Sequence, residues 1–156
     1  MATRSTIALE FADGTVQQVY SHWDGYLEHN GAILLENYSD PFKLRDLIDL
    51  GDISSLGPNI GTKHPFSPHG DAFDKVAYDA AMEAGATTFY GRDRGEEGVE
   101  ARKFANFEDY KANHQYEEFE YILRQVDGKA VWFVSQYGSA YFPLADALEA
   151  TKKEAA

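Results

Sequence analysis

Apolar side chains at every second position predict a hairpin near each end of the chain. Ile7 and Leu9 alternate with smaller or charged residues, and Phe119 and Tyr121 do the same near the other end. A two-residue period is typical of strands with one buried face. Aspartate-glycine pairs, which favour tight turns, interrupt both patterns. The hairpins are expected over 7–23, with a turn at Asp13 and Gly14, and over 118–137, with a turn at Asp127 and Gly128.

Helical periodicity predicts helices between and after these hairpins. Asp40 and Pro41 form an N-cap followed by proline at the first helical position, and Leu44, Leu47 and Ile48 then recur at helical spacing. Glycines end several of these patterns. Helices are expected over 27–38, over 40–51, over 71–85 with Asp71 as the cap, and over 143–150, with a short strand over 87–90 and no assigned element over 100–115.

Together these elements predict an α+β fold in a single domain over 1–150, followed by a frayed tail over 151–156. We expect one mostly antiparallel sheet of about four or five strands, built from the two hairpins, with about three or four helices packed on one face. The segment 51–70 is rich in Gly, Pro and Ser. A loop of that length in a compact domain is uncommon and often functional.

The composition indicates an acidic, folded protein. The chain has 156 residues, of which 44% are hydrophobic, and a formal net charge of −12. It has no cysteine, which excludes disulfides, thiolate metal ligands and a catalytic thiol. No apolar run approaches the roughly 20 residues that span a bilayer, so we expect a cytoplasmic protein without a membrane partner. Because the negative charge repels nucleic-acid backbones, direct DNA or RNA binding is not expected.

The segment 21–26 is the strongest candidate for a functional site. It reads Ser-His-Trp-Asp-Gly-Tyr and lies where a strand pattern gives way to a helix pattern. His22 and Asp24 are two residues apart on an extended segment, so the carboxylate can orient the imidazole as a general base. Trp23 and Tyr26 add aromatic surfaces. In the alternative, structural interpretation, the aromatic rings fill the core, and His22 and Asp24 cap the following helix.

A second candidate is an arginine-rich segment between two glycines. Arg92, Asp93 and Arg94 follow one another there, and guanidinium groups bind phosphate and carboxylate groups bidentately. Arg4 adds a third arginine immediately before the first predicted strand. The alternative is that these arginines pair with neighbouring carboxylates, such as Glu96, in a solvated loop.

Other chemistries have little support in the residue pattern. The five histidines make no His-x-x-x-His pair, and structural zinc patterns need cysteine. A site built from His22, Asp24 and a loop histidine stays open as a minor alternative, but no metal ligand and no cofactor is assigned. The chain also lacks the Gly-x-Ser-x-Gly nucleophile motif and the glycine pattern of a phosphate-binding loop.

Four short motifs in about the first hundred residues are distinctive: Thr-Arg-Ser at 3–5, His-Trp-Asp-Gly-Tyr at 22–26, Leu-Gly-Asp-Ile-Ser-Ser-Leu-Gly at 50–57 and Arg-Asp-Arg-Gly-Glu at 92–96. In these motifs the chain resembles a family of small uncharacterised proteins of tailed phages, prophages and bacterial mobile elements. Ser21 stands where many relatives carry Cys, which counts against an essential thiol there. The resemblance implies a phage accessory protein in the host cytoplasm, and such proteins often inhibit host enzymes or defence systems.

Three hypotheses for the function remain. The favoured one is a protein that binds a small anionic, phosphate- or nucleotide-like ligand in a polar and aromatic pocket, to counter host defence. The first alternative is an acidic inhibitor that mimics nucleic acid and binds a host nucleic-acid enzyme or defence complex. The second is a small hydrolase with His22 and Asp24 as catalytic residues. The expected ligand-binding residues are Arg4, Trp23, Tyr26, Asp52, Ser54, Arg92, Asp93, Arg94 and Glu96.

Overall fold

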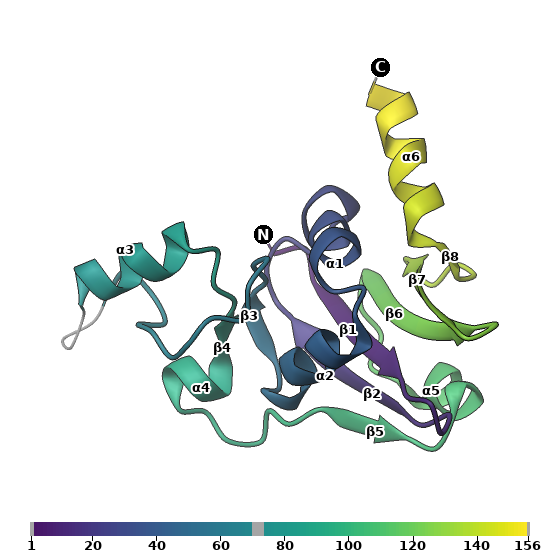
Figure 1. Cartoon of the computed structure of the whole chain (residues 1–156), viewed down its shortest axis with the longest axis horizontal. Helices are drawn as coiled ribbons and strands as arrows, with labels where there is room; N and C mark the ends of the chain where they lie inside the picture. The colour runs from purple at the N-terminus through teal and green to yellow at the C-terminus, as the bar shows by residue number, and fades with distance from the viewer. Residues whose placement is uncertain (1, 70–73, 156) are drawn as a thin grey trace.

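Within residues 2–69 and 74–155, which the computed structural model describes, an eight-stranded mixed sheet forms the centre of an α+β fold (Figure 1). The strands are β1 (Ser5–Glu10), β2 (Val16–Ser21), β3 (Ile53–Ser55), β4 (Thr88–Phe89), β5 (Arg102–Phe104), β6 (Phe119–Val126), β7 (Lys129–Gln136) and β8 (Phe142–Pro143). They lie in the order β4-β3-β2-β1-β6-β7-β8, and β5 pairs with β2 beside β3.

Both predicted hairpins are present, but parallel pairing joins them. β1 and β2 are antiparallel, as are β6 and β7. In contrast, β1 pairs in parallel with β6, and β2 pairs in parallel with β3 through Ser21 and Ile53. Parallel pairing needs a long crossover, and the chain between β1 and β6 supplies one. The sheet therefore exceeds the four or five mostly antiparallel strands expected, because β3, β5 and β8 are too short to show a two-residue period.

The main apolar core covers one face of this sheet. Ile7 and Leu9 of β1 and Val19 of β2 pack there with the apolar sides of several helices. Asp40 caps one of them as expected, since its carboxylate accepts the N–H of Phe42 at 2.9 Å. The helices on this face are η1 (Leu27–Gly31, a π-helical turn), α1 (Ala32–Asn37), α2 (Pro41–Asp49) and α6 (Leu144–Ala155), of which α6 continues past the expected end at 150 into the predicted tail.

One helix lies on the opposite face, so the helices do not all pack on one side as expected. α5 (Phe107–Asn113) places Tyr110 against Ala8 of β1 and Ile122 of β6. Every residue of β1 is buried. A central strand with apolar side chains on both faces needs cover on both, and α5 supplies the second layer.

The remaining two helices of the described residues lie between β3 and β5 along the chain. α3 (Lys75–Glu83) stands apart from the sheet in Figure 1 and has no buried residue. Asp74 caps it, while Asp71, the expected cap, lies outside the described residues. α4 (Tyr90–Arg94) follows β4 directly. None of the helices in the described part of the chain has the length and apolar character needed to cross a bilayer.

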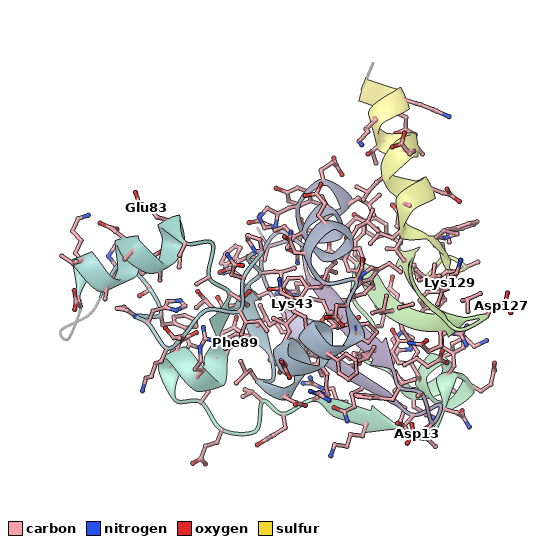
Figure 2. All side chains as sticks on the ribbon, in the orientation of Figure 1. Asp13, Lys43, Glu83, Phe89, Asp127 and Lys129 are labelled. Carbon is pink, nitrogen blue, oxygen red and sulfur yellow. The ribbon has the colours of Figure 1, made fainter. Side chains whose placement is uncertain are left out.

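Hairpin turns and loop ends carry exposed charged side chains. In Figure 2, Asp13 marks the turn between β1 and β2, and Asp127 marks the turn between β6 and β7. Both side chains are exposed at the outer margin of the molecule. Charged tips of this kind keep the hairpin ends in solvent.

Gly25 determines how the chain leaves β2. Its N–H donates to the Thr3 carbonyl at 2.8 Å, and its carbonyl accepts the Tyr121 hydroxyl at 2.6 Å. A Cβ atom at this position would lie 2.7 Å from the Ser5 Cβ and 2.9 Å from the Thr3 carbonyl oxygen. The motifs at 3–5 and 22–26 therefore pack directly against each other, and glycine is required at the contact.

We expect Gly25→Ala to lower the free energy of unfolding by about 3 kcal/mol, because Ser5 and the Thr3 backbone have to move. Urea denaturation followed by circular dichroism measures the loss. Gly95→Ala is the control, since its added Cβ meets nothing within 4 Å. Gly95→Ala should lower the free energy of unfolding by only about 1 kcal/mol, the cost of a left-handed backbone conformation at a residue with a side chain. Equal losses in the two variants would contradict the close packing at Gly25.

Candidate functional site

β2 and β3 together present the start of the segment 22–26. The N–H of His22 donates to the Ile53 carbonyl, and the N–H of Trp23 donates to the Ser54 carbonyl, both at 3.0 Å. The two strands thus stay hydrogen-bonded beyond Ser21, where their regular pairing ends. His22 and Trp23 are held by this backbone pairing at the edge of a rigid sheet.

A buried asparagine secures the turn that follows. Asn30 is fully buried, and its amide donates to the hydroxyls of Ser5 and Ser21 at 3.2 and 3.3 Å. Its backbone N–H donates to the Asp24 carbonyl at 3.2 Å. Asp24 itself has φ +57°, in the left-handed region that reverses the chain. The π-helical turn η1 begins soon after, and such turns occur frequently at functional sites.

Arg4, Tyr20 and His22 meet on the sheet face opposite the main core. The Tyr20 hydroxyl lies 2.6 Å from Nδ1 of His22, and the Arg4 side chain is close enough to act on the pKa of both rings, although burial is the larger cause for each. Burial and then the Arg4 charge lower the pKa of His22, whereas Glu117 acts in the opposite direction. The imidazole is therefore favoured in its neutral form next to a fixed positive charge.

Asp24 is not the partner of His22, contrary to the predicted dyad. The left-handed backbone at Asp24 breaks the alternation of side chains along the strand. Across residues 2–69 and 74–155, no hydrogen bond joins its carboxylate to the His22 ring, and the Tyr20 hydroxyl contacts the ring instead. The orienting carboxylate that a histidine base uses is therefore missing from this position.

Trp23 and Tyr26 do not fill the core. The Trp23 side chain is 45% exposed and packs edge-on against the His22 ring, with 4.6 Å between ring centroids. Tyr26 is also exposed, beside His29. Both rings remain accessible to a ligand that stacks on aromatic surfaces.

Arg92 is fully engaged within the protein and has no donor left for a ligand. Its Nε and one Nη2 hydrogen bond go to Asp93 at 3.0 and 3.2 Å. Nη1 donates to the carbonyls of Ile60 and Gly61, and Nη2 also donates to the Thr87 carbonyl. These five bonds use all five guanidinium hydrogens. Arg92 therefore connects the long loop to α4, which corrects its assignment to an anion pocket.

Asp93 is structural for the same reason. Its side chain is 0% exposed and accepts the backbone N–H of His64 at 3.1 Å and that of Phe89 at 2.8 Å, besides the Arg92 bonds. The His64 ring is buried as well, with its Nε2 at 2.9 Å from the Thr88 hydroxyl. The predicted loop 51–70 is thus anchored to β4 and α4 by a buried polar network.

Arg94 points to the opposite side of α4 from Arg92. Its guanidinium lies over the rings of Phe66 and Tyr90, 4.4 and 5.0 Å from their centroids, and pairs with Glu96. The Tyr90 hydroxyl hydrogen-bonds with the Ser54 side chain. Tyr90 therefore lies between the exposed pair of Arg94 and Glu96 and the buried Ser54 of β3.

Asp52 closes a gap in the sheet. Tyr20 lies between the part of β2 that pairs with β5 and the part that pairs with β3. Its backbone N–H donates to one carboxylate oxygen of Asp52 at 2.9 Å. Arg102 of β5 binds the same carboxylate through both oxygens, at 2.7 and 3.1 Å. Asp52 therefore acts as a bridge between strands rather than as a free ligand-binding group.

Two predicted segments converge, and the sequence analysis missed the residue that joins them. Tyr20 contacts both Arg4 and His22, and Tyr90 contributes to raising the pKa of Tyr20. Tyr20 shares a strand face with His22 because it is two residues away, so the alternation of side chains could have identified it. The candidate site is the exposed surface formed by Arg4, Tyr20, His22 and Trp23.

No group of three His, Asp or Glu side chains that could hold a metal ion occurs among the described residues. Comparison of the chain with protein-family models, with curated proteins and with solved structures finds no match. The function is therefore argued from the chemistry of these side chains.

We expect Arg92→Ala to lower the free energy of unfolding by about 3 kcal/mol, because it leaves the buried Asp93 carboxylate without its partner. Arg94→Ala is the matched control: the Arg94 side chain is 50% exposed, whereas that of Arg92 is 13% exposed. The control should lose less than about 1 kcal/mol. Urea denaturation of both variants tests the difference, and equal losses would contradict the structural role of Arg92.

His22 should make stability fall at acidic pH. Its pKa in the folded protein lies below the ordinary value of 6.5, so protonation favours the unfolded chain. Neutral His22 contributes fully to the free energy of unfolding at pH values above 6.5. This contribution is lost as the pH falls from 6.5 toward the lowered pKa of the folded state. We expect His22→Gln to flatten part of the stability loss between about pH 7.5 and about pH 5.5. His69→Gln, at an exposed loop position, should follow the wild type in thermal melts, and an unchanged slope in His22→Gln would refute the prediction.

Proposed function

We propose that this chain is a binding protein for a small anionic ligand of phosphate or nucleotide type. The ligand is held on the surface formed by Arg4, His22 and Trp23. The observation that carries this proposal is the meeting of Arg4 and His22, joined by the Tyr20 hydroxyl, beside an exposed indole. Arg4 supplies charge for a phosphate, and Trp23 supplies a surface for a base or another planar group.

The local electrostatics support an anion despite the net charge of −12. Burial raises the pKa of Tyr20 and lowers that of His22; the Arg4 charge opposes the first shift and adds to the second, so a positive charge acts on both rings. A bound phosphate would reverse this effect on His22 and favour its protonated, donating form. The ligand is small because an extended polyanion would be repelled by the rest of the surface.

Arg94 and Tyr26 belong to the margins of this site. Arg94 is exposed and already stacked on Tyr90, so it can turn toward a larger ligand without unfolding its surroundings. Arg92, Asp93 and Asp52 have structural roles and are not part of the proposed binding surface. The resemblance to phage proteins adds a context, in which the chain sequesters a nucleotide signal in the host cytoplasm.

The hydrolase alternative is weaker than binding. A histidine base needs an orienting acceptor on the second ring nitrogen, and the partner of His22 is a phenol rather than the Asp24 carboxylate. Binding predicts that the ligand is retained and chemically unchanged after long incubation with the protein, whereas a hydrolase would convert it to products.

We expect Arg4→Ala to weaken nucleotide binding at least tenfold, because a charge-assisted hydrogen bond is worth about 2 kcal/mol. Trp23→Ala should weaken it about tenfold through lost stacking. Calorimetry with nucleoside monophosphates, cyclic dinucleotides and inorganic phosphate measures both effects. Arg45→Ala, which removes an exposed arginine from α2, controls for net charge and should bind as the wild type does.

Two outcomes would refute the proposal. One is the absence of binding to every anion tested, combined with a salt-sensitive complex between the chain and a host protein, which supports the acidic inhibitor instead. The other is equal weakening by Arg4→Ala and Arg45→Ala, because binding would then depend on total charge rather than on this surface.

A further inference from the structure

A separate cavity of about 420 Å³ lies between α5, β6 and the turn that joins β7 to β8. Its polar lining includes an imidazole, a carboxylate, a serine and two tyrosines, and none of these residues belongs to the surface around Arg4. The side chains that matter are His114, Tyr116, Glu120, Ser135 and Tyr141. The connector 114–118 separates this cavity from the neighbourhood of His22, since Tyr116 lines the cavity while Glu117 acts on the His22 ring.

Glu120 carries a buried carboxylate with one oxygen that lacks a good donor. The side chain is 3% exposed, and Oε2 accepts Nε2 of His114 at 2.6 Å. Among the described residues, the contact made by Oε1 is the Tyr141 hydroxyl, at 3.4 Å. A carboxylate offers about four acceptor positions, so Oε1 has capacity for a strong donor.

His114 positions this carboxylate and does not act as a base. Its Nδ1 lies 2.7 Å from the Tyr110 carbonyl, and its Nε2 is occupied by Glu120. Glu120 raises the pKa of His114, which favours the doubly protonated ring that both contacts require. No ring nitrogen remains to accept a proton from a substrate.

Aromatic rings flank the cavity. Tyr116 is 60% exposed at its rim, next to Gly138 in the turn after β7. Tyr141 lies deeper, and burial raises the pKa of its hydroxyl to about 12, so it remains an uncharged donor. Faces of tyrosine rings attract cations, most strongly where the cation is shielded from water.

Lys111 also lines the cavity, but its charge is already compensated. Its ammonium pairs with Glu108 at 3.2 Å and lies over the Phe107 ring, 5.0 Å from the centroid. The cavity therefore presents the Lys111 stem, two tyrosine rings and Oε1 of Glu120, whose carboxylate already pairs with His114 through Oε2. The surrounding molecule adds the field of a net charge of −12, which concentrates cations at its surface.

We propose that this cavity binds an organic cation with an ammonium or guanidinium group, which donates to Oε1 of Glu120 between the rings of Tyr116 and Tyr141. The cation comes either from a free small amine or from an arginine or lysine side chain of a partner protein. This site is independent of the anion-binding surface, because the two sets of residues do not overlap.

The test uses butylguanidinium and its neutral isostere butylurea in calorimetric titrations of the full chain. Butylguanidinium should bind saturably, and butylurea should bind at least tenfold more weakly because it lacks the charge. Glu120→Gln should weaken butylguanidinium binding at least tenfold. Glu36→Gln, which makes the same change in net charge at an exposed position on α1, should leave it unchanged.

A second variant keeps the test valid if Glu120→Gln does not fold. Tyr116→Ala removes an exposed ring, so it should fold normally and weaken butylguanidinium binding about three- to fivefold. Equal binding of butylguanidinium and butylurea, no binding of either, or wild-type affinity in the folded Glu120→Gln variant or in Tyr116→Ala would overturn the proposal.

Two further ligands identify the source of the cation. Agmatine represents a free amine, and the tripeptide Gly-Arg-Gly represents a protein side chain, with Gly-citrulline-Gly as its neutral control. Tighter binding of Gly-Arg-Gly than of agmatine, lost in the citrulline analogue, supports a partner protein. Tighter binding of agmatine than of Gly-Arg-Gly supports a free amine. Neither result depends on Arg4, so Arg4→Ala should bind all of these cations as the wild type does.

Discussion

The burial of β1 on both faces is the constraint on which the rest of the structure depends. Ile7 and Leu9 face the main core, while Ala8 faces α5, and hydrogen-bonded neighbours occupy both edges of the strand. Its start is equally constrained, because Ser5 packs against Gly25. Arg4, the residue just before β1, is therefore brought beside the end of β2, where Tyr20 and His22 lie.

Arginines connect segments that are distant along this acidic chain. Arg92 joins the long loop to α4, Arg102 joins β5 to Asp52, and Arg124 of β6 reaches Glu10 of β1 at 3.0 Å. Each of these arginines also pairs with a largely buried carboxylate, and removal of the arginine would leave that carboxylate without its partner. Arg4 differs because it is exposed and its side chain contacts the Tyr20 hydroxyl. An arginine whose guanidinium donates to carbonyls or carboxylates of the protein is structural, whereas the exposed Arg4 can still donate to a ligand.

The sheet face opposite the main core carries polar side chains from β2, from β6 and from the connector 114–118. The Gln18 side chain hydrogen-bonds with the backbone of Gln115 and so ties the connector 114–118 to β2. This connector separates the surface around His22 from the cavity at Glu120. The proposed anion site lies on one side of this connector, next to Arg4, and the proposed cation site lies on the other, at Glu120.

The sequence by itself determined the local structure: both hairpins and the cap of α2 at Asp40. These features depend on neighbouring residues, whose periodicity and turn chemistry are visible in the chain. Tertiary structure decided the parallel pairing of β1 with β6 and the second helical layer. It also decided that Tyr20 rather than Asp24 contacts His22, and that Arg92 donates hydrogen bonds to backbone carbonyls of the long loop. Every residue has a carbonyl acceptor, so the sequence does not show which carbonyl will bind a given arginine. The partners of a guanidinium group depend on the backbone segments that the fold places next to it.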